Sequence, residues 1–149
     1  MKGQIEIYKS LSKIKGIDFN FQNEDGQTIL HIIATMHLNE EMQNEILKND
    51  KIDVNIQNKD LRTPLHLAID NYNISLATHL INNKKTNLNL IDNLQRTPLI
   101  QILYKMGDAF SRYYRESNEN SNLEKLALLI INSQRLDIFT KDKSISIYF

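Results

Sequence analysis

One motif recurs three times along this chain at an almost constant spacing. The segments Ile17–Thr28, Ile52–Thr63 and Thr86–Thr97 read IDFNFQNEDGQT, IDVNIQNKDLRT and TNLNLIDNLQRT. Their final threonines are 35 and 34 residues apart. A self-similar period of this length is typical of an array of small stacked units, in which each unit contacts only its neighbours. The repeat therefore restricts the fold more strongly than the overall composition does.

Each motif is followed by residues that favour a helix. Thr63 is expected to cap a helix N-terminus, and Pro64 stands at the first helical position, where its missing N–H and fixed φ do no harm. A second stretch of apolar residues at helical spacing follows in every unit. Because two short helices cannot bury both their faces alone, we expect neighbouring units to stack. The pattern predicts an all-α solenoid of helix-turn-helix units joined by β-hairpin-like loops.

The best-preserved unit carries a family resemblance. Asp60–Ala68 reads DLRTPLHLA and resembles the ankyrin-repeat signature, which centres on T-P-L-H-x-A. The first unit keeps Asp25–Thr28 and Leu30-His31, and the third keeps Thr97–Leu99. The resemblance implies an ankyrin-repeat fold over most of the chain.

Several positions depart from that family pattern. Leu61 and Gln95 stand at hairpin tips where the family usually has glycine, and a left-handed backbone there costs a non-glycine residue about 1 kcal/mol or more. In the third unit Ile100 replaces the histidine and Gln101 replaces a core leucine. The third unit is therefore expected to be the least regular.

The spacing of the last motif reveals an insertion. Aligning Leu136–Ile138 with Ile52–Val54 shows about 16 additional residues in the third unit. We expect their first part to prolong a helix beyond Met106 and Ser117–Asn122 to form a solvated loop. The whole chain is expected to be one domain. Its predicted parts are an N-terminal capping helix at 1–16, repeat 1 at 17–51, repeat 2 at 52–85, repeat 3 at 86–135 with its insertion near 107–122, and a partial fourth unit or C-terminal cap at 136–149.

Composition excludes several classes of function. The chain has 149 residues, with 18 Lys and Arg against 18 Asp and Glu, so its formal net charge is zero. This balance argues against nucleic acid and a polybasic membrane anchor as partners. There is no cysteine, and no apolar run approaches the ~18 residues that span a bilayer. We expect a monomer in the cytoplasm, either of the source cell or of a host.

No catalytic constellation is recognisable. His31 and His66 occupy equivalent positions, which indicates a structural role beside the capping threonines rather than catalysis. His37 and His79 have no partners at metal-ligand spacing. Phosphate loops and nucleophile elbows are also missing from the sequence. The sequence thus predicts a protein that is not an enzyme and that uses no cofactor and no metal.

The resemblance implies a scaffold that binds a partner protein through its hairpin tips and the concave face of its first helices. Aromatic residues of the insertion beside Arg112 and Arg115 form a second candidate contact, with packing against the core as the alternative. The predicted partner-binding residues are Gln22, Glu24, Asp25, Gln27, Thr35, Met36, Gln57, Lys59, Asp60, Arg62, Asp70, Asn71, Ile91, Asn93, Leu94, Arg96, Tyr104, Lys105, Phe110, Tyr113 and Tyr114.

A different role remains open at this point. The chain could be the targeting part of a larger protein whose activity lies elsewhere. Abundant Asn, Lys and Ile with only 4 Gly is typical of an AT-rich genome. Divergent ankyrin proteins of intracellular bacteria and large viruses act on host proteins, so a host-directed effector is the alternative hypothesis.

Overall fold

A computed structural model describes residues 10, 13, 16–36, 40–111 and 117–136 of this chain. This part is helical and has no strand, as the sequence predicts. The predicted capping helix at 1–16 and the end of the chain at 137–149 lie largely or wholly outside these residues. The helices are α2 (Ile29–Thr35), α3 (Glu40–Leu47), α4 (Pro64–Asp70), α5 (Ile74–Asn82), α6 (Pro98–Ser111) and α7 (Ser117–Asn132).

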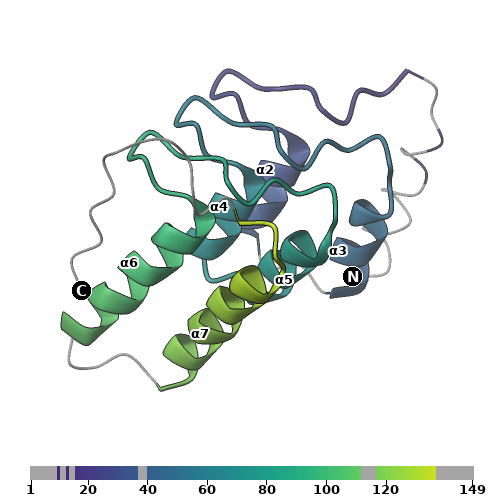
Figure 1. The fold of residues 1–149 in the computed structure, drawn as a ribbon. Helices are drawn as coiled ribbons and strands as arrows, with labels where there is room; N and C mark the ends of the chain where they lie inside the picture. Colours follow the sequence, from purple (N-terminus) through teal and green to yellow (C-terminus); the bar gives the residue numbers. More distant parts are fainter. Residues whose placement is uncertain (1–9, 11–12, 14–15, 37–39, 112–116, 137–149) are drawn as a thin grey trace.

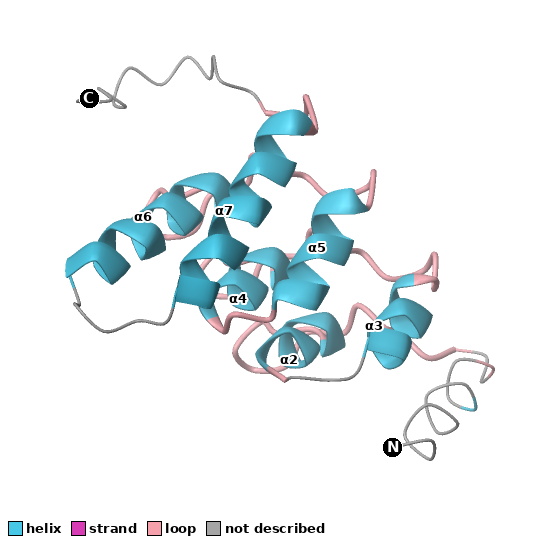
Figure 2. Cartoon of the chain, turned by 90° about the horizontal axis from the view of Figure 1, so that it is seen from below, coloured by secondary structure: helices cyan, strands magenta, loops and turns pink. Residues whose placement is uncertain are grey.

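The helices form three successive pairs arranged in two rows. In one row α2 contacts α4 and α4 contacts α6, while in the other α3 contacts α5 and α5 contacts α7. Within pairs, α4 packs on α5 and α6 packs on α7. Three long loops extend side by side beyond the N-termini of α2, α4 and α6 (Figure 1). The view from below shows the pairs following one another from α2–α3 to α6–α7 (Figure 2).

One apolar core runs through all three pairs. Leu30 in α2, Leu65 in α4 and Ile102 in α6 are almost completely buried, and they share this core with Leu80 in α5 and Ile130 in α7. Burying a leucine or isoleucine side chain contributes about 1.5–3 kcal/mol. The middle pair is covered on both sides, because α4 contacts both α2 and α6.

The helix starts follow the sequence signals. Thr63 accepts a hydrogen bond from the backbone N–H of His66 at 3.4 Å, and Pro64 occupies the first turn of α4. Thr97 accepts from the N–H of Ile100 at 3.3 Å at the start of α6. Asn73 caps α5 by accepting from the N–H of Leu76 at 3.2 Å.

The loops before α2, α4 and α6 close as tight hairpins. The N–H of Asn23 donates to the carbonyl of Gln27 at 3.0 Å, and the same bond recurs in the next two units. Gly26, Leu61 and Gln95 follow the turn with φ of 73°, 56° and 59°, which is the left-handed region. The tip geometry expected of glycine is therefore kept, at a cost, by a leucine and a glutamine.

The insertion is more helical than expected. α6 has 14 residues and α4 has 7, so the predicted prolongation beyond Met106 is confirmed. The loop expected at Ser117–Asn122 is wrong, because α7 begins at Ser117. Extending a helix N-terminally from the buried residues Leu123 and Leu126 costs little once the helix exists.

Candidate functional site

The predicted partner-binding residues between Gln22 and Lys105 are all exposed or half-buried. They come from the hairpin loops and from α2, α4 and α6, which the repeat brings to one side of the chain. Phe110 lies in α6, but its side chain belongs to the undescribed part of the structure. Tyr113 and Tyr114 lie outside the described residues. That Phe110, Tyr113 and Tyr114 contact a partner therefore stays a prediction.

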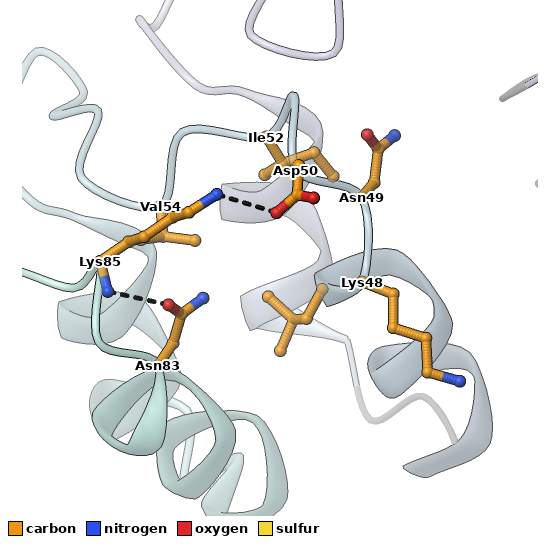
Figure 3. Close-up of a pocket in the computed structure, with 8 residues that line it drawn as sticks. Lys48, Asn49, Asp50, Ile52, Val54, Asn83 and Lys85 are labelled. Atoms are coloured by element: carbon orange, nitrogen blue, oxygen red, sulfur yellow. Dashed lines mark hydrogen bonds and ion pairs between the residues drawn. The ribbon is translucent and has the colours of Figure 1, made fainter.

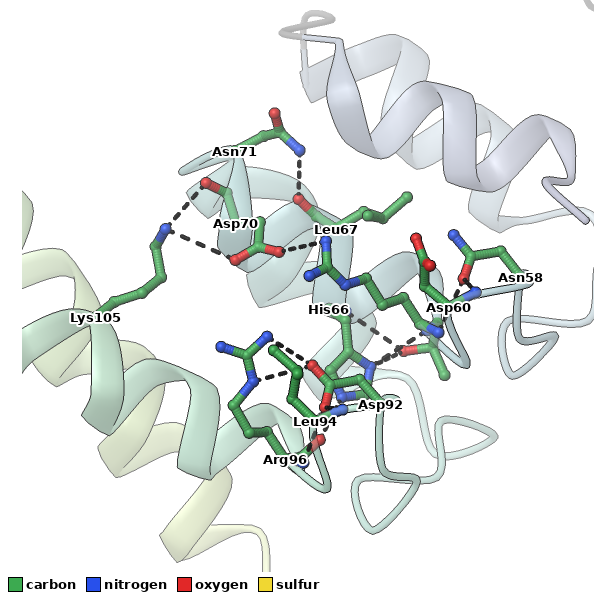
Figure 4. A network of polar contacts seen from close by, with 12 residues as sticks. Asn58, Asp60, His66, Leu67, Asp70, Asn71, Asp92, Leu94, Arg96 and Lys105 are labelled. Carbon is green, nitrogen blue, oxygen red and sulfur yellow. Dashed lines mark hydrogen bonds and ion pairs between the residues drawn. The ribbon is translucent and has the colours of Figure 1, made fainter. Parts of the chain in front are cut away.

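Each hairpin tip is held by its first residue. The side-chain oxygen of Asn58 accepts hydrogen bonds from the N–H groups of Asp60 and Arg62, both at 3.0 Å. In the third unit, Asp92 does the same for Leu94 and Arg96, both at 2.9 Å (Figure 4). Such side-chain turns fix the backbone without help from a ligand.

The tips are also joined to one another. The N–H of Lys59 donates to the carbonyl of Asp25 at 3.1 Å, and the N–H of Asn93 donates to the carbonyl of Asp60 at 3.0 Å. Gln57, predicted as a contact residue, donates from Nε2 to the carbonyl of Ile91 at 2.8 Å. Gln22 makes the equivalent contact one unit earlier. These two glutamines thus connect repeats, a role that the sequence analysis missed.

Both predicted structural histidines bind their capping threonine. Nδ1 of His66 lies 2.8 Å from Thr63 Oγ1 and accepts from the Thr63 N–H, while Nε2 donates to the carbonyl of Arg96 at 3.0 Å. His31 repeats this arrangement with Thr28 and the carbonyl of Arg62. Burial lowers the pKa of both histidines. The neutral rings therefore link each first helix to the next repeat.

An ion network crosses the first-helix side of the second and third units (Figure 4). Asp70 lies 3.2 Å from the Arg62 guanidinium and 3.7 Å from Lys105 Nζ. Lys105 also donates to the carbonyl of Asp70 at 3.1 Å and lies 4.3 Å from the centre of the Tyr72 ring. Asp70 therefore forms ion pairs with both Arg62 and Lys105 and so connects the two units.

The second arginine of the predicted surface is bound even more firmly. Arg96 donates to Asp92 Oδ2 from Nε at 3.0 Å and from Nη2 at 2.7 Å. Burial alone would raise the pKa of Asp92, but the hydrogen bonds from Arg96 outweigh it and lower the pKa. The guanidinium also lies 5.7 Å from the centre of the Tyr104 ring. Arg96 therefore stabilises its own hairpin, and reversing its charge would leave a buried carboxylate unpaired.

The polarity of the surface changes along the array. Glu24 and Asp25 occupy the first tip, and Lys59 and Asp60 occupy the second. At the third tip, Leu94 takes the place of Asp60, and its side chain is 60% exposed. Other exposed apolar residues lie in the hairpin loops, in α2 or directly after it, and in α6. They are Phe21, Ile29, Ile32, Met36, Leu61, Ile91 and Tyr104. The third tip therefore offers a more apolar surface than the first two.

A small pocket lies away from these residues, between the turns that follow α3 and α5 (Figure 3). It has a volume of about 190 Å³. Its charged groups Asp50 and Lys85 pair at 2.9 Å, and the hydrogen bond and charge of Lys85 lower the pKa of Asp50. A cavity of this size with its charges already paired is too small for a typical ligand site.

The described residues also lack two other kinds of site. No cluster of three or more His, Cys, Asp or Glu side chains there could hold a metal ion. None of the helices in this part has both the length and the apolar character that a bilayer crossing requires.

Comparison with known families identifies the repeat. A family model described as ankyrin repeats (3 copies) matches residues 1–92, more than half of the chain. The chain belongs to the ankyrin-repeat family. Such repeats are generally protein–protein interaction modules and are typically non-catalytic. The matched region ends before α6, so the third helix pair lies outside it. No curated protein matches the chain.

Proposed function

We propose that this protein is a scaffold that binds a partner protein through its hairpin tips and first helices. The observation that carries the proposal is the preorganisation of the tips, which are held both internally by Asn58 and Asp92 and mutually by the backbone bonds from Lys59 and Asn93. A rigid surface loses little conformational entropy when it binds, so affinity is gained without new contacts.

The proposal extends to the organisation of the chain. The units 17–51, 52–85 and 86–135 form one monomeric ankyrin solenoid, and the stacked helix pairs support this arrangement. The inter-repeat bonds support the length of the insertion. Asn55 Nδ2 donates to the carbonyl of Lys85, 30 residues on, whereas Asn89 Nδ2 donates to the carbonyl of Arg135, 46 residues on. The difference of 16 residues equals the insertion inferred from the sequence.

The side chains available to a partner are those that neither hold a hairpin together nor link two repeats. Glu24, Asp25, Lys59, Asp60 and Asn93 are exposed at the tips. Their charges set specificity and association rate more than affinity, since exposed ion pairs contribute about 0.2–1 kcal/mol each. The apolar contribution comes from the third unit, where Leu94 and Tyr104 are each 60% exposed. A role as the recruiting part of a larger host-directed effector would use the same surface in the cytoplasm.

The test exchanges charges on the tips and leaves the ion network intact. Lys59→Glu with Asp60→Lys should weaken the binding of a purified partner at least about fivefold in calorimetry, because like charges then face each other across the interface. Glu124→Lys with Lys125→Glu is the matched control, since both residues are exposed on α7, away from the tips, and this exchange also leaves the net charge unchanged. Full binding by the tip variant together with a loss in the control would reject the proposed surface.

A second pair of variants tests the insertion as the anchor. Tyr113→Ala with Tyr114→Ala should leave binding within about twofold if the tips carry recognition. A loss of binding at unchanged melting temperature would instead assign recognition to the insertion, because exposed aromatic anchors contribute to binding and little to the core.

A further inference from the structure

The three hairpin tips lie side by side, yet each presents a different chemistry (Figure 1). Glu24 and Asp25 are exposed at the first tip, and the second carries the opposite charges of Lys59 and Asp60. The third tip has no charged residue, and its Leu94 is 60% exposed. Because a backbone hydrogen bond joins each tip to the next, these chemistries follow one another in a fixed order along the row.

The first tip forms the acidic end of this row, which consists of Glu24 and Asp25. Within the described residues, neither of these carboxylates forms an ion pair. The guanidinium groups of Arg62 and Arg96 are bound by other carboxylates. The negative charge at the acidic end can therefore attract cationic side chains of a partner.

The other end of the row is apolar. Leu61 at the second tip is 45% exposed, and Leu94 and Tyr104 are each 60% exposed. The backbone bond between the second and third tips is made by the residues directly before Leu61 and Leu94, so both leucines follow on the contact between the tips. The Tyr104 ring lies 5.7 Å from the guanidinium of Arg96, which belongs to the third hairpin. These three residues form the apolar end of the row.

Folding alone does not explain the leucine at position 61. The φ of Leu61 is 56°, in the left-handed region that glycine adopts without strain. Its side chain is almost half exposed, so burial compensates only part of the cost. Residues held in strained backbone conformations are concentrated at binding sites. Contact with a ligand therefore explains an exposed leucine at this tip better than folding does.

The distance between the two ends sets the spacing that a partner needs. Helices packed as α2, α4 and α6 are have axes about 8–10 Å apart, so the first and third tips are about 16–20 Å apart. An extended chain advances about 3.3 Å per residue, so about five or six residues span the row.

We propose that the row of tips binds an extended segment of the partner protein. The segment places basic side chains at the acidic end and a large apolar side chain at the apolar end, about five or six residues apart. This inference rests on the proposed partner-binding function and adds the chemistry of the partner. Lys59 and Asp60 lie between the two ends and balance in charge, so the middle of the segment needs no net charge.

Panning a displayed library of random 12-residue peptides on the full chain tests this inference without a known partner. The enriched peptides should share basic residues and a large apolar residue at the stated spacing. A synthetic peptide of the enriched sequence then serves as the probe in fluorescence anisotropy. Enriched peptides that lack either feature, or no enrichment at all, would overturn the inference.

A variant of the apolar end measures its share of the binding. Leu94→Ser should weaken the binding of the peptide at least about tenfold, because a central apolar anchor contributes much of the affinity of an interface. Leu128→Ser is the matched control, since Leu128 is 57% exposed but lies on α7, in the other row of helices. Both variants should keep the melting temperature of the natural chain. Unchanged binding by Leu94→Ser would contradict the apolar contact.

A second variant neutralises the acidic end. Glu24→Gln with Asp25→Asn should weaken the peptide's binding about fivefold at low salt and remove most of its salt dependence. Glu41→Gln with Glu124→Gln changes the net charge by the same amount at exposed positions of α3 and α7 and should have little effect. An equal loss in both variants would mean that the overall charge attracts the peptide, and the acidic end would be rejected as the site.

Failure of this inference is distinguishable from failure of the proposed function. The charge exchange at Lys59 and Asp60 tests the partner-binding surface itself. If that exchange weakens the binding of the partner but no enriched peptide has the expected pattern, the surface binds a folded partner and only the extended segment is rejected.

Discussion

The second and third repeats have the same architecture but different surroundings. In the second repeat, Leu65 and Ile69 are buried, because helices lie on both sides of α4. In the third, their counterparts Leu99 and Leu103 are half-buried and exposed. The sequence follows this difference, since the family signature is complete only in the second repeat. Among the described residues, helices lie on both sides of the second repeat and on one side of the third, and the third repeat is the one that lacks the histidine and the core leucine of the signature.

The largest expected difference concerns one leucine position. Leu65→Ala should lower the free energy of unfolding by about 2–5 kcal/mol, because it leaves a cavity between three helix pairs. Leu99→Ala should cost less than half as much, since that side chain is already partly in water. Urea denaturation of both variants measures the difference. Equal midpoint shifts would contradict the contrast between the repeats, and Glu24→Ala at an exposed tip serves as a control expected to cost under about 0.5 kcal/mol.

The second and third repeats also differ in a histidine link, whose effect depends on pH. His66 links the second repeat to the third, whereas Ile100 stands at this position in the third. Since burial lowers the pKa of His31 and His66, the unfolded chain binds protons more readily. Their stabilising effect is present above the unfolded pKa of 6.5 and is lost progressively as the pH falls below it. Urea denaturation at pH 7.5 and 5.5 should show this loss. His31→Gln with His66→Gln should cost about 1–3 kcal/mol at pH 7.5 and flatten the pH dependence. If the free energy of unfolding changes equally between these pH values in the natural chain and in the double variant, the rings do not titrate as inferred.

A buried glutamine destabilises the third repeat, so replacing it should raise the free energy of unfolding. Gln101 stands at the position equivalent to Leu67 in the second repeat. Its side chain is fully buried, and neither Nε2 nor Oε1 has a hydrogen-bond partner in the structure. An unsatisfied buried amide costs about 1–3 kcal/mol. Gln101→Leu should therefore raise the free energy of unfolding by about 1–2 kcal/mol. A destabilised variant in thermal denaturation would mean that the amide has a partner after all.

The smallest effect concerns the hairpin tips and should be the same in both repeats. Leu61 and Gln95 have φ of 56° and 59°, and glycine accepts this conformation without strain. Leu61→Gly and Gln95→Gly should each stabilise the chain by about 0.5–1 kcal/mol. Matching gains would confirm that the tips are equivalent. A loss at Leu61 alone would show that its side chain packs against something.

The elements that depend on short-range signals were predictable from the sequence. The cap at Thr63, the proline after it and the role of His66 follow from residues within four positions of each other. The period placed the helix pairs because the same short-range signals recur in each repeat. The segment Ser117–Asn122 was predicted wrongly because its polar residues suit a loop and a helical turn equally well.

The long-range contacts were not predictable in the same way. Nothing local indicates that Gln57 bonds to the next loop or that Asp70 holds both Arg62 and Lys105. A comparison of equivalent positions could have suggested one of these contacts. Asn58 precedes Arg62 by four residues, whereas Asp92 precedes Arg96 by four, so the residue at this position offers the arginine a carboxylate only in the third unit.

The central claim is that the tips and first helices bind a partner protein. A photoreactive benzoylphenylalanine placed at Asp60 or, as the control, at Lys84 tests it most directly, because both positions are exposed but only Asp60 belongs to a tip. In a lysate of the cell in which the protein acts, the account predicts that the Asp60 probe yields a discrete cross-linked product that unlabelled chain competes away, while the Lys84 probe yields none. A specific product from Lys84 and none from Asp60 would contradict it.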